Sequence, residues 1–220
     1  MTEQDTTTAP DRRAEQTIEL TGFELLSLLS LGDDASARKT RESLRLPEVP
    51  EASPLLGAGL SSLIVRKMAT VDAAGTLTPQ GPVLALAAVL NRATEWIEAA
   101  GVSGETNHVA LLVKSPDGAA LIEPKEYGIW QALPVPAGDR LIDVASRYVR
   151  ATFQDVTTLP FAGSIKVIAQ PGAPTGDRAA AVRIGEDKAW EISSGPVERL
   201  PKPVPVAADP TFGLLAKALA

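Results

Sequence analysis

Short apolar stretches joined by tight turns constrain the fold of this chain more than any other feature. Residues 109–113 are apolar on both faces, as in a strand inside a sheet, and lead into the turn Ser115-Pro116-Asp117-Gly118, after which residues 119–123 form a second apolar stretch. Residues 180–184 and 190–192 alternate, with Arg183 and Glu191 between apolar neighbours, and are joined by another short turn. Alternation of this kind predicts strands, and such turns leave no room for a crossover helix. The strands are therefore expected to be antiparallel.

Helical spacing predicts the elements that flank these strands. Thr21-Gly22-Phe23-Glu24 has the form of a capping box and opens a leucine-rich helix. Ser53-Pro54 has the form of an N-cap followed by a first helical residue. The strongest helical pattern runs from Pro82 to near Gly101, and Asp209-Pro210 opens a last helix. Helices, strands, a helix, strands and a helix in this order predict an α+β fold with a central antiparallel sheet flanked by helices.

The second half of the chain repeats the order of the first. Each half has one helix followed by two strands, at 82–100, 107–114 and 119–123 in the first half and at 139–153, 164–170 and 179–184 in the second. This echo predicts quasi-two-fold halves, about 18–134 and 135–220, within a single α+β domain. The polar segment 1–17 has no apolar run and is expected to be a disordered tail. Residues 128–134 fit either a strand or a short helix.

Composition excludes several classes of function. The net charge of −6 argues against a protein that binds nucleic acid or an anionic membrane. The absence of cysteine excludes a thiol nucleophile and the usual sulfur-ligated zinc site. The single histidine, His108, has no acid pair at catalytic spacing to work with. We therefore predict no enzymatic activity, no metal site and no cofactor.

Two glycines within a predicted helix have a structural interpretation. Gly57-Ala58-Gly59 lacks the third glycine of a dinucleotide-binding turn and follows no strand. Glycine inside a helix costs about 1 kcal/mol relative to alanine. The pair therefore indicates either close packing against a neighbour or a weak helix.

The expected compartment is the cytoplasm. Residues 1–17 do not form a secretory signal, and no stretch reaches the roughly 18 apolar residues of a membrane-spanning helix. A chain without cysteine is compatible with a reducing compartment. We expect no membrane insertion.

Residues 56–81 support an alternative function. A helix over 56–68, a turn at 72–75 and the sequence Leu77-Thr78-Pro79-Gln80-Gly81 resemble the recognition helix, wing and following motif of a winged-helix transcriptional regulator. This helix offers Gly, Leu and Ser to a duplex, with Arg66 and Lys67 only at its end, so donors for bases and phosphates are few. Whether 76–81 is a wing or a connector stays open, as does the DNA-binding alternative.

The order of several segments also resembles a known family. These segments are a leucine-rich first helix after an acidic start at 18–26, a hairpin-like stretch at 71–79, a long Ala/Leu helix before the hairpin at 109–123, strands around Gly163-Ser164-Ile165 and Trp190-Glu191-Ile192, and a terminal helix opened by Asp209-Pro210. This layout is similar to that of the EspG-type chaperones of actinobacterial type VII (ESX) secretion. The resemblance implies a quasi-two-fold α+β protein that keeps a helical secretion substrate pair soluble in the cytosol, with no catalysis and no cofactor.

The candidate partner-binding residues are apolar side chains beside flexible segments, namely Leu159, Phe161, Pro171, Ala173, Pro174 and Phe212. Loops on a rigid scaffold often carry recognition, so a helical client is expected to insert an apolar tip near the loop at 171–177. The residues assign neither the identity of the client nor an oligomeric state.

Overall fold

The structure is a computed structural model that describes residues 17–32, 34–50, 52–155 and 158–220. The predicted tail over 1–17 lies outside the described residues except for Thr17. The helices are α1 (Gly22–Leu29), α2 (Ala35–Ser43), α3 (Pro54–Val65), α4 (Pro82–Asn91), α5 (Leu141–Asp155) and α6 (Gly213–Leu219). The strands are β1 (Ile18–Thr21), β2 (Ala69–Val71), β3 (Leu77–Pro79), β4 (Glu95–Ser103), β5 (Thr106–Ser115), β6 (Gly118–Pro124), β7 (Ile129–Pro134), β8 (Phe161–Ile168), β9 (Arg178–Ile184), β10 (Trp190–Pro196) and β11 (Val204–Val206).

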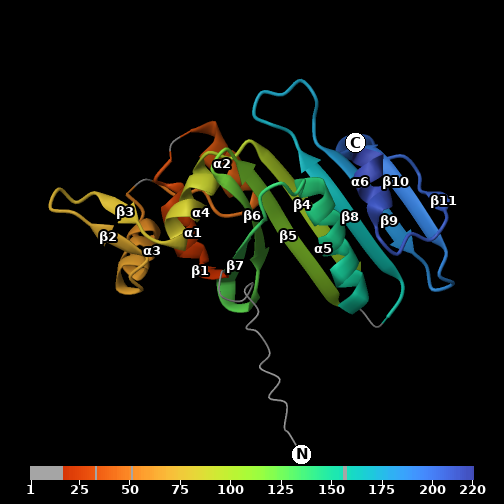
Figure 1. Cartoon of the computed structure of the whole chain (residues 1–220), viewed down its shortest axis with the longest axis horizontal. Helices are drawn as coiled ribbons and strands as arrows, with labels where there is room; N and C mark the ends of the chain where they lie inside the picture. Colours follow the sequence, from red (N-terminus) through yellow and green to blue (C-terminus); the bar gives the residue numbers. More distant parts are fainter. Residues whose placement is uncertain (1–16, 33, 51, 156–157) are drawn as a thin grey trace, which may run out of the picture.

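A single large sheet runs through both halves of the chain (Figure 1). Its nine strands lie in the order β1-β7-β6-β5-β4-β8-β9-β10-β11, and every neighbouring pair is antiparallel. The hairpin β2–β3 lies apart, beyond α3 (Figure 1). The predicted α+β class with a central antiparallel sheet is confirmed. The undecided stretch before residue 135 is strand β7.

The helices cover opposite faces of the sheet in the two halves. Trp96 of β4 packs with the bundle α1–α4 on what we call the first face, whereas its neighbour Ile97 packs with α5 and α6 on the second face. Strands β4–β7 form one meander and β8–β11 form another, and the two meanders meet where β4 pairs with β8. Because β4 and β8 are antiparallel, a two-fold axis normal to the sheet relates the strands of the two halves. That axis would leave all the helices on one face. The predicted quasi-two-fold relation therefore holds for the strands and not for the helices.

The prediction of one helix from Pro82 to near Gly101 is wrong in its second part. Helix α4 ends at Asn91, and the chain continues as β4, the strand at the centre of the sheet. Both Trp96 and Ile97 are 1% exposed because helices cover both faces of this strand. A strand buried on both faces does not alternate in hydrophobicity, so its sequence resembles that of a buried helix.

Helix α5 lies close against the seam between the halves. Gly101 of β4 and Gly163 of β8 are directly opposite each other in the sheet. A Cβ atom on Gly101 would lie 2.2 Å from Thr152 Oγ1, and one on Gly163 would lie 2.5 Å from Val149 Cγ1. Only hydrogen fits at these two positions, so the glycine pair sets the distance between α5 and the sheet.

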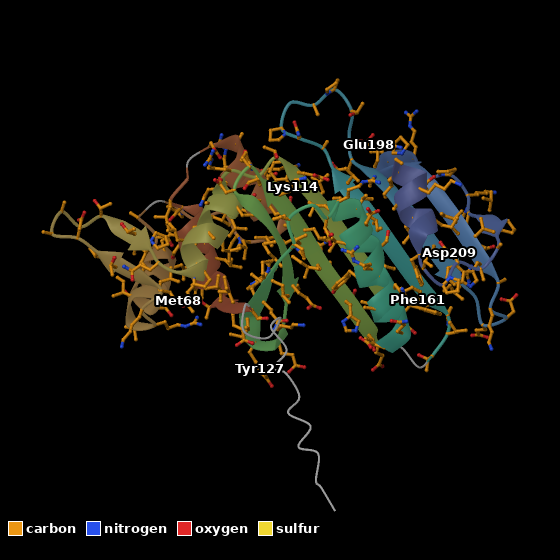
Figure 2. All side chains as sticks on the ribbon, in the orientation of Figure 1. Met68, Lys114, Tyr127, Phe161, Glu198 and Asp209 are labelled. Carbon is orange, nitrogen blue, oxygen red and sulfur yellow. The ribbon has the colours of Figure 1, made fainter. Side chains whose placement is uncertain are left out.

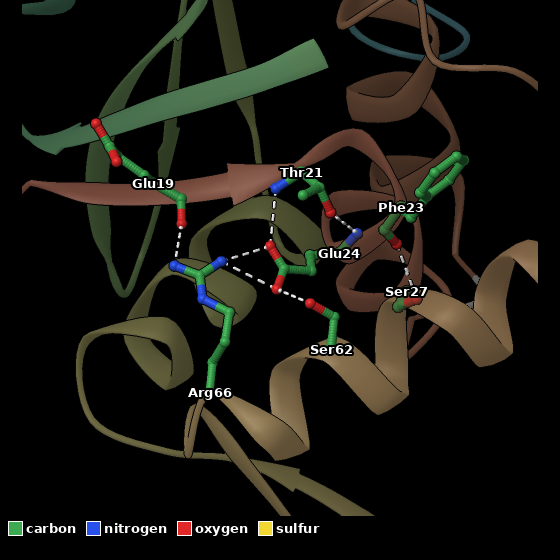
Figure 3. Close-up of polar contacts among 7 residues, drawn as sticks. All are labelled: Glu19, Thr21, Phe23, Glu24, Ser27, Ser62 and Arg66. Atoms are coloured by element: carbon green, nitrogen blue, oxygen red, sulfur yellow. Dashed lines mark hydrogen bonds and ion pairs between the residues drawn. The ribbon is translucent and has the colours of Figure 1, made fainter. Parts of the chain in front are cut away.

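Glu24 is a fully buried carboxylate that is held by α1, α3 and β1 (Figure 3). The N–H of Thr21 donates to Oε2 at 2.7 Å, Ser62 Oγ donates to Oε1 at 2.7 Å, and Arg66 Nη1 donates to both oxygens at 3.0 and 2.7 Å. Arg66 Nη2 also donates to the carbonyl oxygen of Glu19 at 2.8 Å. The predicted capping box is confirmed, since Thr21 Oγ1 in turn accepts from the N–H of Glu24 at 3.2 Å.

The same contacts set the acidity of Glu24. Burial by itself raises the pKa of this carboxyl, but the hydrogen bonds from Thr21, Ser62 and Arg66 and the positive charge of Arg66 outweigh burial. The pKa of Glu24 therefore lies below its ordinary value.

We expect Glu24→Gln to lower the free energy of unfolding by about 2 kcal/mol at neutral pH, and to lower it less in acid. An unfolded glutamate has a pKa of about 4.3. Because the folded pKa is lower, the carboxylate stabilises the fold fully above that value, and its contribution falls as the pH falls through the folded pKa. Urea unfolding of both proteins at pH 7 and pH ~3 checks this. The exposed Glu48→Gln, which removes only an ion pair of 3.5 Å to Arg41, is the control. An equal deficit at both pH values would contradict the prediction.

Candidate partner-binding surface

Two of the predicted partner-binding residues are core residues. Phe161 at the start of β8 and Phe212 before α6 are each 1% exposed, and Phe161 lies at the end of α5 (Figure 2). They form an aromatic cluster with Phe153 and Trp190, with ring centroids 5.0 Å apart for Phe153 and Phe161 and 5.2 Å apart for Trp190 and Phe212. The structure thus gives Phe161 and Phe212 a packing role in place of the expected surface role, because α6 folds back over β8 and β9.

Leu159 lies at the same end of β8 and is half-buried. It lines a hollow of about 400 Å³ together with Phe153, Lys188, Trp190 and Pro210. Of the six predicted residues, Leu159, Phe161 and Phe212 are therefore brought together around one aromatic cluster.

Pro171, Ala173 and Pro174 lie at the opposite end of β8 and are all exposed. They belong to the loop between β8 and β9 that extends at the top of Figure 1. Asp177 holds the base of this loop, because its Oδ1 accepts from the N–H of Ala169 at 2.9 Å and its carbonyl accepts from the N–H of Val197 at 2.9 Å. An exposed tip on a fixed base matches the expectation for a recognition loop.

The structure has a further surface that the sequence does not predict, and we call it the open floor. It consists of small or exposed side chains on the first face of β4, β8, β9 and β10, namely Ala100, Val102, Ala162, Ser164, Ala181 and Ser193. Ser193 is buried, and the other five are half-buried or exposed. In the first half of the sheet the same face is packed under α4 and is fully buried at Leu111, Val113 and Ile122.

An apolar hollow marks one end of the open floor. It has a volume of about 330 Å³ and is lined by Val102, Ala162 and Ala181 on the floor and by Pro160 and Pro203 at its sides. Val102 is 41% exposed. Arg183 and Glu191, 3.8 Å apart, form an ion pair that borders the hollow. An apolar centre with a polar rim is typical of a protein–protein interface.

Polar groups bound the rest of the floor. Glu98 of β4 accepts from Arg45 Nη2 at 2.8 Å and lies 3.8 Å from Lys166 Nζ, so the loop after α2 forms one side. On the other side, Pro201 lies against β10, where its carbonyl accepts from Ser193 Oγ at 2.6 Å. The open floor is therefore bordered by the loop after α2 on one side and by Pro201 on the other, with the apolar hollow at one end.

The helix and the hairpin of a winged-helix unit are present, but helix α3 lacks the positively charged side chains that would contact DNA. Helix α3 is followed by the hairpin β2–β3, in which Asp72 Oδ1 accepts from the N–H groups of Ala74 and Thr76 at 2.9 Å each. The exposed residues of α3 are uncharged, namely Pro54, Leu55, Gly57, Ala58, Ser61, Ile64 and Val65. Phosphate contacts need cationic or strong hydrogen-bonding side chains, which this helix face lacks.

Groups that could carry metal chemistry are not gathered in the described part of the chain. Within residues 17–32, 34–50, 52–155 and 158–220, no three His, Cys, Asp or Glu side chains are arranged to hold a metal ion. His108 is half-buried in β5, opposite Gly101. Among the same residues, no helix has the length and hydropathy needed to cross a membrane.

Comparison with known proteins gives a likeness of fold. No family model and no curated protein matches the sequence. The structure is similar to that of the Mycobacterium tuberculosis type VII secretion system chaperone EspG5, solved in complex with the PE25–PPE41 dimer, with a TM-score of 0.58 and 10% sequence identity. The alignment covers 92% of this chain and 95% of that chain. The resemblance to an EspG-type chaperone, expected from the sequence, is confirmed at the level of the fold.

Proposed function

We propose that this protein is a cytoplasmic, secretion-associated chaperone that binds a helical substrate pair of type VII secretion and keeps it soluble. The observation that carries the proposal is the open floor with its apolar hollow, on a fold similar to that of a chaperone solved with a PE–PPE dimer. Binding and release of such a client require no catalytic group, metal or cofactor.

The dimensions of the open floor suit one helix of the client. From Ala162 to Lys166 the floor runs ~13 Å along β8, which is the length of about nine helical residues. Small side chains at Ala162, Ser164 and Ala181 let a helix lie close to the sheet, and the hollow accepts one large apolar side chain. Pro171, Ala173 and Pro174 contact the client beyond the Lys166 end of the floor, and Leu159 is a further contact beyond the sheet.

We expect Ala162→Arg to weaken capture of the client strongly. A guanidinium in the hollow both fills the space for the apolar anchor and places a charge in the interface, which should cost about 2 kcal/mol or more, a ~30-fold loss of affinity. The test is co-expression with helical proteins encoded beside this gene, followed by copurification and titration. Ala151→Arg, at an exposed position on α5, is the matched control and should bind as the parent does. Equal capture by both variants would contradict the role of the floor.

Two further experiments test the role of the loop at 171–177 and the DNA-binding alternative. Deletion of residues 172–176 should weaken capture, and unchanged capture would remove the loop from the proposed site. A DNA-binding regulator should shift duplex DNA with an affinity that falls steeply with salt, whereas the proposed chaperone should not shift it. Tight, salt-dependent DNA binding without any copurifying helical partner would favour the winged-helix alternative.

A further inference from the structure

Within the described residues the nine-stranded sheet is open and has β1 and β11 as its edges. An exposed edge presents N–H and C=O groups that another chain can pair with. At one edge this is prevented by proline, because β11 contains Pro205 and follows Pro203, and neither residue has an N–H to offer. Strand β1, with the sequence Ile-Glu-Leu-Thr, contains no proline and needs another form of protection.

The outward-facing groups of β1 can be identified from their contacts. Along a strand, the N–H and C=O of one residue point to one side, and those of the next residue point to the other. The C=O of Glu19 accepts from Arg66, and the N–H of Thr21 donates to Glu24. Glu19 and Thr21 are therefore the residues whose backbone groups point away from β7, while Ile18 and Leu20 direct theirs toward it.

We propose that the Glu24–Arg66 ion pair is a clamp that closes the β1 edge against pairing with a second copy of this chain. One ion pair occupies both the outward C=O of Glu19, at 2.8 Å, and the outward N–H of Thr21, at 2.7 Å (Figure 3). A cleft of about 760 Å³, lined by Ile18, Glu19 and Arg66 among others, lies beside the strand. Without the clamp, this cleft gives an approaching strand access to the edge.

Helix capping accounts for only half of this arrangement. The contact between Thr21 and Glu24 belongs to the capping box of α1. Arg66 instead comes from the end of α3, 42 residues away in sequence, and its second nitrogen reaches past the carboxylate to the Glu19 carbonyl. That last contact contributes nothing to the cap of α1, but it occupies an outward acceptor that an added strand would use.

The test frees the Glu19 carbonyl, the half of the clamp that Arg66 holds, without leaving an unpaired buried charge. In the double variant Glu24→Gln/Arg66→Met, the glutamine keeps an acceptor for the N–H of Thr21, and both charges are removed together. We expect a fold unchanged by circular dichroism and a mass in sedimentation equilibrium that doubles relative to the parent as concentration rises. Arg66→Lys is the second variant, because it keeps a charge beside Glu24 but lacks the forked guanidinium that reaches Glu19, and it should associate in the same way.

A third substitution identifies the associating surface. Glu19→Pro, added to the double variant, removes the outward N–H of Glu19, so the β1–β7 ladder keeps its hydrogen bonds while the edge loses the donor beside the freed carbonyl. The triple variant should return to the mass of the parent. Association that persists in the triple variant would place the contact elsewhere and overturn the proposal. Folded clamp variants that keep the parent's mass at every concentration would overturn it as well.

Discussion

Replacing Gly59 by alanine should destabilise the protein by about 3 kcal/mol, a large loss for the addition of one methyl group. A Cβ atom on Gly59 would lie 2.1 Å from the carbonyl oxygen of Phe23 and 2.2 Å from Ser27 Oγ. The first of these is backbone, so α1 and α3 must move apart. That movement also stretches the hydrogen bond from Ser27 Oγ to the carbonyl of Leu56, now 2.8 Å.

Gly57 provides a matched control two residues away in the same helix. A Cβ atom there meets nothing within 4 Å. Gly57→Ala should therefore stabilise the protein by about 0.5–1 kcal/mol, through the higher helix propensity of alanine. Urea unfolding of both variants measures the difference. Equal effects of the two substitutions would show that α1 and α3 do not pack as closely as the structure has them. Of the two alternatives that the sequence leaves open, close packing applies to Gly59. No neighbour approaches Gly57, so this glycine only weakens the helix.

Phe212→Ala should release the C-terminal helix and lower the free energy of unfolding by about 3–5 kcal/mol. Phe212 is buried against three aromatic rings and is held at φ +57°, a backbone conformation that alanine adopts no more easily. Helix α6 has only seven residues, too few for it to persist without its packing. Amides of α6 should then exchange with solvent at the rate of an open chain.

Trp190 reports on the same change, since its ring lies 5.2 Å from that of Phe212. Loss of the aromatic contact should shift the fluorescence of Trp190 toward that of a solvated indole. Lys217→Ala, at an exposed position of α6, serves as the control and should leave exchange and fluorescence unchanged. If α6 amides stay protected in Phe212→Ala, Leu215 and Leu219 hold the helix by themselves.

Turn chemistry and capping were readable from the sequence because they depend on neighbouring residues. The capping box at Thr21, the hairpin turn at 115–118 and the antiparallel pairing of β9 with β10 all follow from local patterns. Strand β4 could not be predicted in this way, because burial on both faces removes alternation from its sequence. Helix α2 was also missed, since its composition is polar and its buried residues are only Ala37 and Thr40.

The candidate site was predicted only in part, for a similar reason. The loop residues Pro171, Ala173 and Pro174 are exposed as expected, because proline and glycine favour a surface connection. The sequence predicts Phe161 to be a surface residue because bulky apolar side chains beside a loop fit either a core or an interface. The open floor left no motif, since it consists of small side chains that come together from four strands far apart in sequence.

The close packing of α5 on Gly101 and Gly163 has a consequence for protein engineering. By sequence α5 belongs to the second half, but it buries Ile97, Ala99 and Leu112 of the first. A fragment ending at residue 134 would expose those side chains to water and would be expected to aggregate. The halves that the sequence repeats are thus unsuited to separate expression or to exchange between homologues, and a workable junction would have to keep α5 with both β4 and β8.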